Sequence, residues 1–527
     1  MRRGLLAAGP ALFLAVFFVW PVATILAEGL DRSTLSRVAT DGGLWQVLWF
    51  TTWQAAISTA ATVVVGVPTA FVFARYRFPG RRMMWAALVV PFVLPTVVVG
   101  VAFRTLLGRG GPLAGLGIDQ HVAAIVLAHL FFNLAVVVRT VGSAWAHVPR
   151  SLEEAAASLG AGPARVFREV TLPAIRPALA SAAVVVFLFC FTSFGVVLLL
   201  GPPGTSTLEV EIYRQTAHLL DLPTASALAA VQLVATSALL ATYLALDARR
   251  RRVPALAAAE RRAPRGRAVP MVAGVIAFTA LLLGAPLVSL VVRSFSVGPG
   301  WGLAWYRSLV SGAGASTRDI DLVATFGRSV ACGLAATGLA LALGGAATAV
   351  LARGRARLLD LAVMIPLGTS AVTLGFGFLL ALDTPPLDLR GRWVLVPIAQ
   401  GLVALPFVVR VLLPATRAVD PRLRQSAAVL GAAPRRVWRE VDLPLLSGAA
   451  RVAAAFAFAV SLGEFGATVF IARPESTTMP IAIARSLARP GPANLGAAMA
   501  MSTVLMVVTV AAVALVDRRS ASTVAGF

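Results

Sequence analysis

One carboxylate in this sequence lies inside an apolar stretch, where a charged side chain is uncommon. Glu464 stands in the run SLGEFGATVF, and a charged side chain in such a segment costs enough free energy that a functional role is the first hypothesis. At an offset of 271 its counterpart is Ser193 in FTSFGVVLLL, and both residues precede Phe-Gly. A carboxylate here suits a cation. The alternative is a buried carboxylate that pairs with Arg104 or Arg328 and only fixes the packing.

The other residues that could bind a metal or catalyse a reaction are scattered. Cys190 and Cys332 lie in apolar runs at a spacing that fits neither a metal site nor a disulfide framework, so both are expected to pack. Asp319-Ile320-Asp321 spells the metal-binding DxD of a membrane glycosyltransferase, but its neighbours add no carboxylate cluster or His for acid and base chemistry. Two solvated loop aspartates are the favoured alternative. No metal site is expected, and four His are interpreted as structural or interfacial: His121, His129, His147 and His218.

Composition places these residues in a membrane. The chain has 527 residues, of which 58% are hydrophobic and 13% charged, and its mean hydropathy is +0.84. These values are typical of a polytopic membrane protein. The sequence contains no Lys, so its net charge of +23 comes from Arg. Because the Arg residues cluster at the ends of apolar segments, they indicate topology and not nucleic-acid binding.

Twelve apolar segments are long enough to cross a bilayer as helices. The positive-inside rule places the Arg-rich loops, and with them both termini, on the cytoplasmic side. The orienting residues are Arg2, Arg3, Arg75, Arg77, Arg81, Arg82, Arg353, Arg355, Arg357, Arg518 and Arg519. The predicted spans are 5–28, 46–74, 83–107, 121–142, 174–200, 224–247, 270–292, 324–352, 358–382, 392–414, 446–471 and 493–516.

Two loops repeat each other across the chain. EAAASLGAGPARVFREVTLP begins at Glu154 and QSAAVLGAAPRRVWREVDLP at Gln425, and thirteen of the twenty aligned positions are identical. This is an internal duplication. It predicts a first domain at 1–247 with its loop at 150–173, an Arg-rich cytoplasmic linker at 248–268, and a second domain at 269–527 with its loop at 420–444.

Each repeated loop is expected to form two short helices and a stop. Ser151 followed by Glu154 predicts a capping box, and Gly160 should end the first helix. Asp420 should cap the equivalent helix, which Gly431 ends. A helix of about eight residues is unstable alone in water. It therefore needs a partner surface, and the alternative is a pair of helices that merely lies on the bilayer.

These residues resemble the signature of permease subunits of ABC importers: Glu-Ala-Ala, three residues, Gly, nine residues, an aliphatic residue, one residue, and Leu-Pro. The first copy fits with Val in place of the usual Ile, and the second departs from the signature at its first two positions. The matching residues are Glu154, Ala155, Ala156, Gly160, Val170, Leu172 and Pro173, against Gln425, Ser426, Ala427, Gly431, Val441, Leu443 and Pro444.

The resemblance covers nearly the whole chain and is to fused permeases of the iron(III) and thiamine branch. It implies an all-α fold of two six-helix permease domains in a bacterial inner membrane. It also implies that the repeated loops are coupling helices that dock on a separate ATPase homodimer, and that an extracytoplasmic solute-binding protein delivers the solute. The chain has no Walker A motif, so ATP and Mg are expected on the partner and no cofactor on this chain.

The resemblance also gives the fifth helix of each half a place along the translocation path. Ser193, Phe194, Glu464 and Phe465 are therefore the gate candidates. Thiamine is favoured slightly over iron(III), because the phrase STLEVEIY looks like the corresponding loop of thiamine permeases.

Two further hypotheses concern the outward loops and the class of transporter. Loops 201–223 and 472–492 are predicted to meet the binding protein, with solvated loop charges as the alternative. A twelve-span secondary transporter is the rival architecture, because the loop RYRFPGRR resembles the basic turn of such proteins. The candidate contact residues are Glu209, Glu211, Tyr213, Arg214, Glu475, Arg485 and Arg489.

Overall fold

The computed structural model describes residues 2–31, 34, 36, 40, 42–250, 261–298, 300–311, 321–352, 354, 357–383, 385 and 387–517. Several sequence predictions fall wholly or partly outside these residues. They are residues 251–260 of the Arg-rich linker, the first two residues of the DxD tripeptide, and Arg353, Arg355, Arg518 and Arg519.

The first half of the chain is built from helices that follow the predicted apolar segments. Several of these helices contain a π-helical turn, so one long helix can comprise two or three of the elements named below. The elements are α1 (Arg2–Leu14), η1 (Ala15–Val19), α2 (Trp20–Gly29), α4 (Gly42–Arg75), α5 (Arg81–Ala87), α6 (Val90–Val93), α7 (Thr96–Leu107), η2 (Ala114–Leu116), α8 (Val122–Ala146), α9 (Arg150–Ser158), α10 (Pro163–Val166), η3 (Phe167–Thr171), α11 (Leu172–Phe191), α12 (Gly195–Leu200), α13 (Leu208–Arg214), η4 (Gln215–Leu219) and α14 (Leu222–Arg250).

The second half repeats this order and adds a β-hairpin after its first span. Each strand of the hairpin has two residues, and Ser296 lies opposite Trp301. The elements are α15 (Ala268–Ser294), β1 (Ser296–Val297), β2 (Gly300–Trp301), α16 (Ala304–Ser311), α17 (Leu322–Leu351), α18 (Arg357–Gly368), α19 (Ala371–Ala381), α20 (Leu395–Ala418), α21 (Pro421–Val429), α22 (Pro434–Val437), η5 (Trp438–Asp442), α23 (Leu443–Gly463), α24 (Thr468–Ile471), η6 (Pro474–Ser476), α25 (Met479–Ala488) and α26 (Pro492–Asp517).

The all-α fold and the number of spans are confirmed. Among the described residues, ten helices are long and apolar enough to cross a membrane, and two bent helix pairs bring the number to twelve. The third span of each half is one of these bent pairs, with angles of 107° in the first half and 99° in the second. The spans predicted at 83–107 and 358–382 are therefore bent pairs of helices and not single helices.

The breaks in the third spans have local causes. Leu94 is extended, with ψ of 141°, because the residue before a proline, here Pro95, disfavours the helical region. At the equivalent position of the second half Ser370 caps α19, since its Oγ accepts the N–H of Val372 at 3.0 Å.

The fifth spans are also broken, so the predicted helices at 174–200 and 446–471 are not continuous. In the first half α11 ends at Phe191 and α12 starts at Gly195. In the second half α23 ends at Gly463 and α24 starts at Thr468. All four gate candidates lie in or beside these two breaks.

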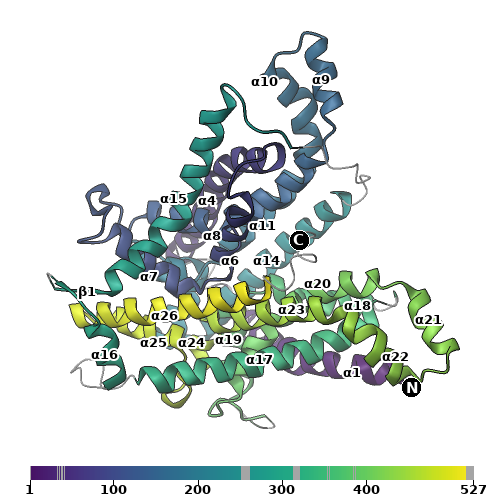
Figure 1. Ribbon diagram of the computed structural model, residues 1–527. Helices are drawn as coiled ribbons and strands as arrows, with labels where there is room; N and C mark the ends of the chain where they lie inside the picture. Colours follow the sequence, from purple (N-terminus) through teal and green to yellow (C-terminus); the bar gives the residue numbers. More distant parts are fainter. Residues whose placement is uncertain are drawn as a thin grey trace.

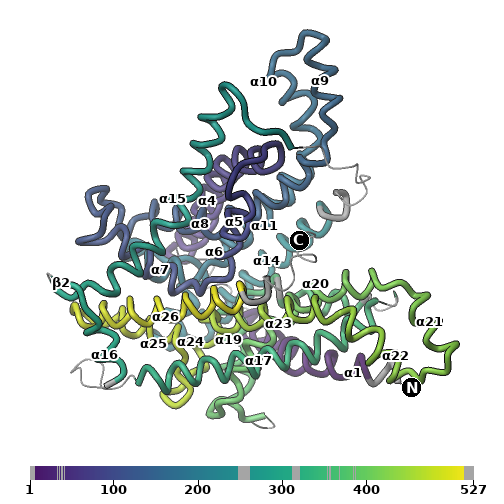
Figure 2. The backbone as a smooth tube through the Cα atoms, in the orientation of Figure 1, coloured from purple at the N-terminus to yellow at the C-terminus, as the bar shows by residue number. Residues whose placement is uncertain are grey.

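The first span of each half packs on the other half. The α1 helix lies along α17 (Figures 1 and 2), and α2 packs on α19. In return, α15 packs on α7 and α4. The two halves are therefore interlocked by their first helices.

The molecule is open at the end that carries the repeated loops and joined at the other. In Figure 1 α9 and α10 lie at the top, whereas α21 and α22 lie far from them at the lower right. At the opposite end α7 packs on both α25 and α26. The two repeated loops are thus splayed apart.

Candidate coupling loops and gate

Both repeated loops end their first helix in the same way. Gly160 has φ of +85° and Gly431 has φ of +82°, the left-handed conformation that glycine adopts without strain. Ala161 donates its N–H to the carbonyl of Ala156 at 3.1 Å, and Gly160 donates to Ala157 at 3.0 Å. The same two bonds recur in the second copy. This is the Schellman arrangement, and it confirms that the two glycines end their helices.

The start of the first loop helix differs from the prediction. The α9 helix begins at Arg150 after Pro149, which makes no side-chain cap. Ser151 is already inside the helix, so the predicted capping box is wrong. In the second copy the Oδ1 of Asp420 accepts the N–H of Arg422 at 2.9 Å, which confirms that cap.

Sequence reasoning missed an apolar tip on each loop. Leu159 is 89% exposed and Leu430 is 87% exposed, and the two residues are equivalent at the offset of 271. Beside Leu430, Val429 is 87% exposed as well. Exposed large apolar residues at a helix tip are typical of a surface that a partner covers. Their matched positions just before the two glycines were the sequence signal that could have identified them.

The first loop is fastened to the membrane end of α4 by a buried arginine. Arg75 is 4% exposed and pairs with Oε1 of Glu153 at 2.7 Å. The same carboxylate oxygen accepts a hydrogen bond from Thr171 at 2.8 Å, and Arg75 also donates to the carbonyl of Val148 at 3.2 Å. The Glu153 carboxylate, near the start of the loop, therefore holds Thr171, near its end, and connects both to Arg75.

The second loop uses different chemistry at the same two positions. Arg424 replaces Glu153 and Asp442 replaces Thr171 at the offset of 271. Their side chains form an ion pair at 2.7 Å, with Arg424 34% exposed. An ion pair that solvent reaches contributes little stability, so the first loop is the more firmly held.

Glu154 already has a partner within the chain. Nη2 of Arg262, at the end of the linker, lies 3.1 Å from its Oε1. Arg262 is positioned by two backbone hydrogen bonds, because it donates to the carbonyl of Arg75 and accepts from Arg77. The equivalent residue in the second copy is the neutral Gln425. The two loops thus share a shape and differ in charge.

The remaining predicted loop residues surround this helix. Ala155, Ala156, Ser426 and Ala427 lie within α9 and α21. Leu172 and Leu443 begin the fifth spans, with Pro173 and Pro444 in their first turns. The helix that begins at Pro163 continues through a π-helical turn to Phe191, and the helix that begins at Pro434 continues in the same way to Gly463, so the predicted stop at the Leu-Pro pairs is wrong.

The gate candidates meet where the two halves join. The rings of Phe194 and Phe465 stack with centroids 5.4 Å apart and planes 19° apart. Phe194 is 6% exposed and Phe465 is 3% exposed. The structure therefore brings together two equivalent residues from breaks that lie far apart in the sequence.

Glu464 lies beside this pair and caps a helix. Its Oε1 accepts the N–H of Ala467 at 2.7 Å, and its Oε2 accepts the N–H of Thr468 at 3.0 Å. These bonds satisfy free donors at the start of α24. The carboxylate is thus held at the break of the fifth span, one residue before Phe465. Its counterpart Ser193 lies at the equivalent break in the first half.

The comparisons with known proteins agree with this geometry. The model of the family described as binding-protein-dependent transport system inner membrane component matches residues 62–252. These residues include the first repeated loop and the fifth span of the first half. The molybdenum transport system permease protein of Mycobacterium bovis is 34% identical over 39% of this chain and 81% of its own length. This chain belongs to the family of binding-protein-dependent transport permeases.

Fused relatives extend this match over both halves. The thiamine transport system permease protein of Brucella suis is 28% identical over 92% of this chain and 89% of its own length. That of Escherichia coli K12 is 27% identical over 84% of this chain and 83% of its own length. The prediction of an importer permease is confirmed, and the secondary transporter and glycosyltransferase alternatives are set aside.

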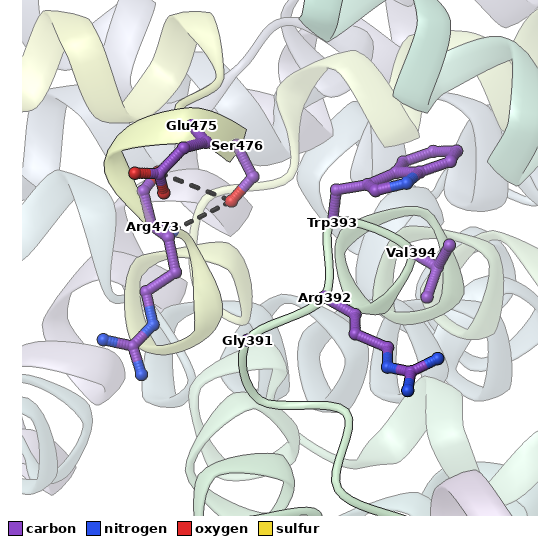
Figure 3. A pocket seen from close by; sticks show the side chains of 7 residues that line it. All are labelled: Gly391, Arg392, Trp393, Val394, Arg473, Glu475 and Ser476. Atoms are coloured by element: carbon purple, nitrogen blue, oxygen red, sulfur yellow. Dashed lines mark hydrogen bonds between the residues drawn. The ribbon is translucent and has the colours of Figure 1, made fainter.

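In this permease a cavity of about 550 Å³ opens beside the loop 472–492, one of the two that were expected to meet a binding protein. Figure 3 shows Trp393 and Val394 on one side of it and Glu475 and Ser476 on the other. Arg392 and Arg473 also line it. It lies between the segment before α20 and the loop that contains η6.

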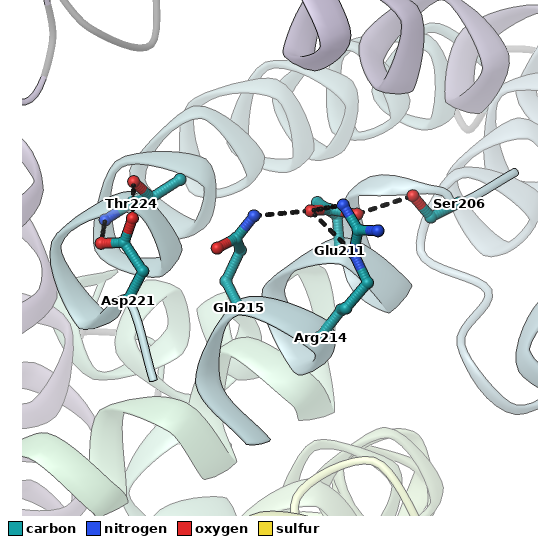
Figure 4. A network of polar contacts seen from close by, with 6 residues as sticks. All are labelled: Ser206, Glu211, Arg214, Gln215, Asp221 and Thr224. Atoms are coloured by element: carbon teal, nitrogen blue, oxygen red, sulfur yellow. Dashed lines mark hydrogen bonds and ion pairs between the residues drawn. The ribbon is translucent and has the colours of Figure 1, made fainter. Parts of the chain in front are cut away.

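Two carboxylates predicted on the surface of the permease are buried instead. Glu211 is 1% exposed, and Figure 4 shows its carboxylate between Ser206, Arg214 and Gln215. The Arg214 and Gln215 side chains donate to its Oε1 at 2.8 and 2.7 Å. Glu209 is fully buried. Neither carboxylate is exposed to a binding protein, so that prediction is wrong for both.

Glu209 joins the two halves of the permease. Its Oε2 accepts a hydrogen bond from Ser370 at 2.6 Å, and its Oε1 accepts one from Gln232 at 2.8 Å. Ser370 caps α19 in the second half, whereas Gln232 lies on α14 in the first. Burial raises the pKa of Glu209 to about 8, against the effect of both hydrogen bonds.

This shift predicts how stability depends on pH. A carboxyl group whose pKa rises on folding stabilises the folded state at low pH, and this contribution is lost as pH rises through the folded pKa. Between pH 4.5 and 8, the wild type should lose up to about 1.4 kcal/mol of stability per pH unit relative to Glu209→Gln. Thermal unfolding of the two purified proteins at pH 5, 6.5 and 8 measures the difference. Parallel curves for the two proteins would contradict the assignment.

The other residues that could do chemistry are placed as follows. Cys190 and Cys332 are buried free thiols, and no group of three possible ligands for a metal lies within the described ranges. His129 is buried beside Ser58 at 3.0 Å. Asp321 caps α17 through the N–H of Ala324. These contacts are structural.

Proposed function

We propose that this permease forms the membrane pathway of an ATP-driven importer for thiamine or its phosphate esters. The observation that carries the proposal is that fused thiamine permeases match along both halves. Iron(III) is the alternative solute of the same branch. The proposed domains are residues 1–247 and 269–527, joined by a cytoplasmic linker at 248–268.

The two repeated loops are proposed to dock on a separate ATPase homodimer in the cytoplasm. Their shared Gly-ended shape and exposed Leu159 and Leu430 support two equivalent docking sites. ATP and Mg belong to that partner. The two loops and both termini are proposed to lie on the cytoplasmic side. Because the loops are splayed apart at that side, we interpret the structure as an inward-open state of the permease.

Closure of the ATPase dimer would draw the two loops together and turn the pathway outward. Hydrolysis would then reset the inward-open state. A solute-binding protein would deliver the solute to the opposite face, where the cavity lined by Arg392, Arg473 and Trp393 lies.

Uptake measurements test the function. A strain that lacks the gene should lose uptake of labelled thiamine, and the full-length chain should restore it. Iron(III) uptake in the same strain is the matched comparison. Loss of iron(III) uptake with normal thiamine uptake would overturn the choice of solute. Transport that persists after deletion of the partner ATPase would overturn the ATP-driven mechanism.

Glu464 is expected to serve the pathway through its charge as well as through its cap. Glu464→Gln keeps one acceptor oxygen and loses the other cap bond, which costs about 1 kcal/mol. We expect uptake of the cation thiamine to fall about tenfold with protein levels within about twofold of wild type. Ser193→Ala, at the uncharged counterpart, is the control. Equal small losses for both variants would restrict Glu464 to the cap.

A further inference from the structure

The two glycines that follow the gate pair pack closely against the third spans. A Cβ on Gly195 would lie 2.5 Å from Oγ1 of Thr96, and one on Gly466 would lie 3.0 Å from Cβ of Ala371. Thr96 and Ala371 are equivalent first residues of α7 and α19. Each Phe-Gly pair is therefore pressed against the break of a third span. This packing determines where the two rings lie.

A further aromatic ring lies against the pair. Tyr213 lies edge-on to Phe194 with centroids 5.5 Å apart, and it also contacts Phe470 at 5.8 Å. The positions equivalent to Tyr213 and Phe470 in the other half are Ala484 and Leu199. Tyr213 and Phe470 therefore have no aromatic counterparts at the equivalent positions of the duplication.

An aromatic pair offers more than a seal. Any two large apolar side chains can close a pathway, but stacked rings present flat faces that carry partial negative charge. When such rings separate, a flat aromatic cation can enter between them and stack against the ring faces. It then gains both stacking and cation–π attraction, which a leucine pair does not provide.

We propose that Phe194 and Phe465 form a selective slot for flat aromatic cations, in which the solute passes between the two ring faces while Tyr213 lines one edge. The inference rests on the proposed function, because it specifies the solute class of that same pathway. It adds that the chain itself contributes to selectivity at the point where its halves meet. In the inward-open state the rings rest on each other and close the slot.

Paired substitutions test the slot in the complete importer. The double variant Phe194→Leu, Phe465→Leu keeps large apolar side chains and removes both ring faces. Labelled thiamine uptake in cells should fall about tenfold in kcat/KM, whereas passive efflux of thiamine from proteoliposomes without ATP should stay at the wild-type level. Phe465→Tyr keeps both ring faces and should retain most uptake. Phe13→Leu, which removes a ring contact from the outer helix α1, is the control.

The outcomes separate the slot from the proposed function. Normal uptake by the leucine double variant would overturn the slot and leave the thiamine importer standing. Increased passive efflux together with lost uptake would also overturn it, because the rings would then act only as a seal. A wild-type chain that takes up no thiamine would overturn the proposed function and the slot with it.

Discussion

Replacement of Gly160 or Gly431 by valine is expected to abolish ATP-driven uptake while the permease remains in the membrane. Both glycines have positive φ, at +85° and +82°, and a left-handed conformation costs a β-branched residue about 1 to 3 kcal/mol. No atom lies within 4 Å of the position that a Cβ would take on either glycine, so the strain is confined to the backbone of the loop. The helix end should then reshape, and the docking tip with it. Uptake and membrane-protein levels, measured in parallel, check the prediction.

The chain provides a matched control two residues further on. Gly162 has φ of −66°, a Cβ there would meet no atom within 4 Å, and the second copy carries Ala433 at the equivalent position. Gly162→Ala should therefore transport normally. Gly160→Asn should retain part of the activity, because Asn tolerates the left-handed region. Full transport by both valine variants would remove the loops from the coupling mechanism.

The repeated loops were predictable because their structure is encoded locally. Gly160, Gly431 and the prolines that follow them determine where each helix ends and starts, and no distant contact is needed to read them. The twelve spans were predictable for the same reason, since apolar length alone identifies a membrane helix. The stacked pair was half predicted. The Phe-Gly repeats marked the residues, but nothing in the sequence indicated that two breaks would meet.

The features that sequence reasoning missed depend on tertiary contacts. An apolar run looks the same whether it is one helix or two, so the breaks at Leu94 and Thr192 were read as continuous spans. Glu209 lies in a stretch between spans and was assigned to the surface, although it is buried against Ser370 of the other half. The exchange of first helices between halves likewise leaves no local signal, because the contacts that fix it join segments far apart in the chain.

Removal of Arg75 is expected to have the second largest effect. Its guanidinium is 4% exposed and pairs with Glu153, and loss of one member of a buried pair costs about 3 to 5 kcal/mol because the remaining charge is unpaired. Glu153 is 24% exposed, so Arg75→Met should fall near the lower value. Uptake should fall at least as strongly, because α9 would no longer be held to α4. Thermal unfolding and thiamine uptake of the same variant measure the two effects.

A second substitution separates stability from coupling. In Arg75→Met, Glu153→Leu no carboxylate is left unpaired, so stability should partly recover, whereas uptake should remain low because the loop still lacks its attachment. Arg77→Met, at an exposed arginine two residues after Arg75, is the control. Recovery of uptake together with stability would show that Arg75 serves folding alone. Asp442→Ala in the second loop should cost less than about 1 kcal/mol, since its ion pair is reached by solvent. A stronger dependence of transport on the Arg75–Glu153 pair than on the Arg424–Asp442 pair would mean that the two docking sites, although alike in shape, are held unequally. They would then transmit the force of the ATPase unequally.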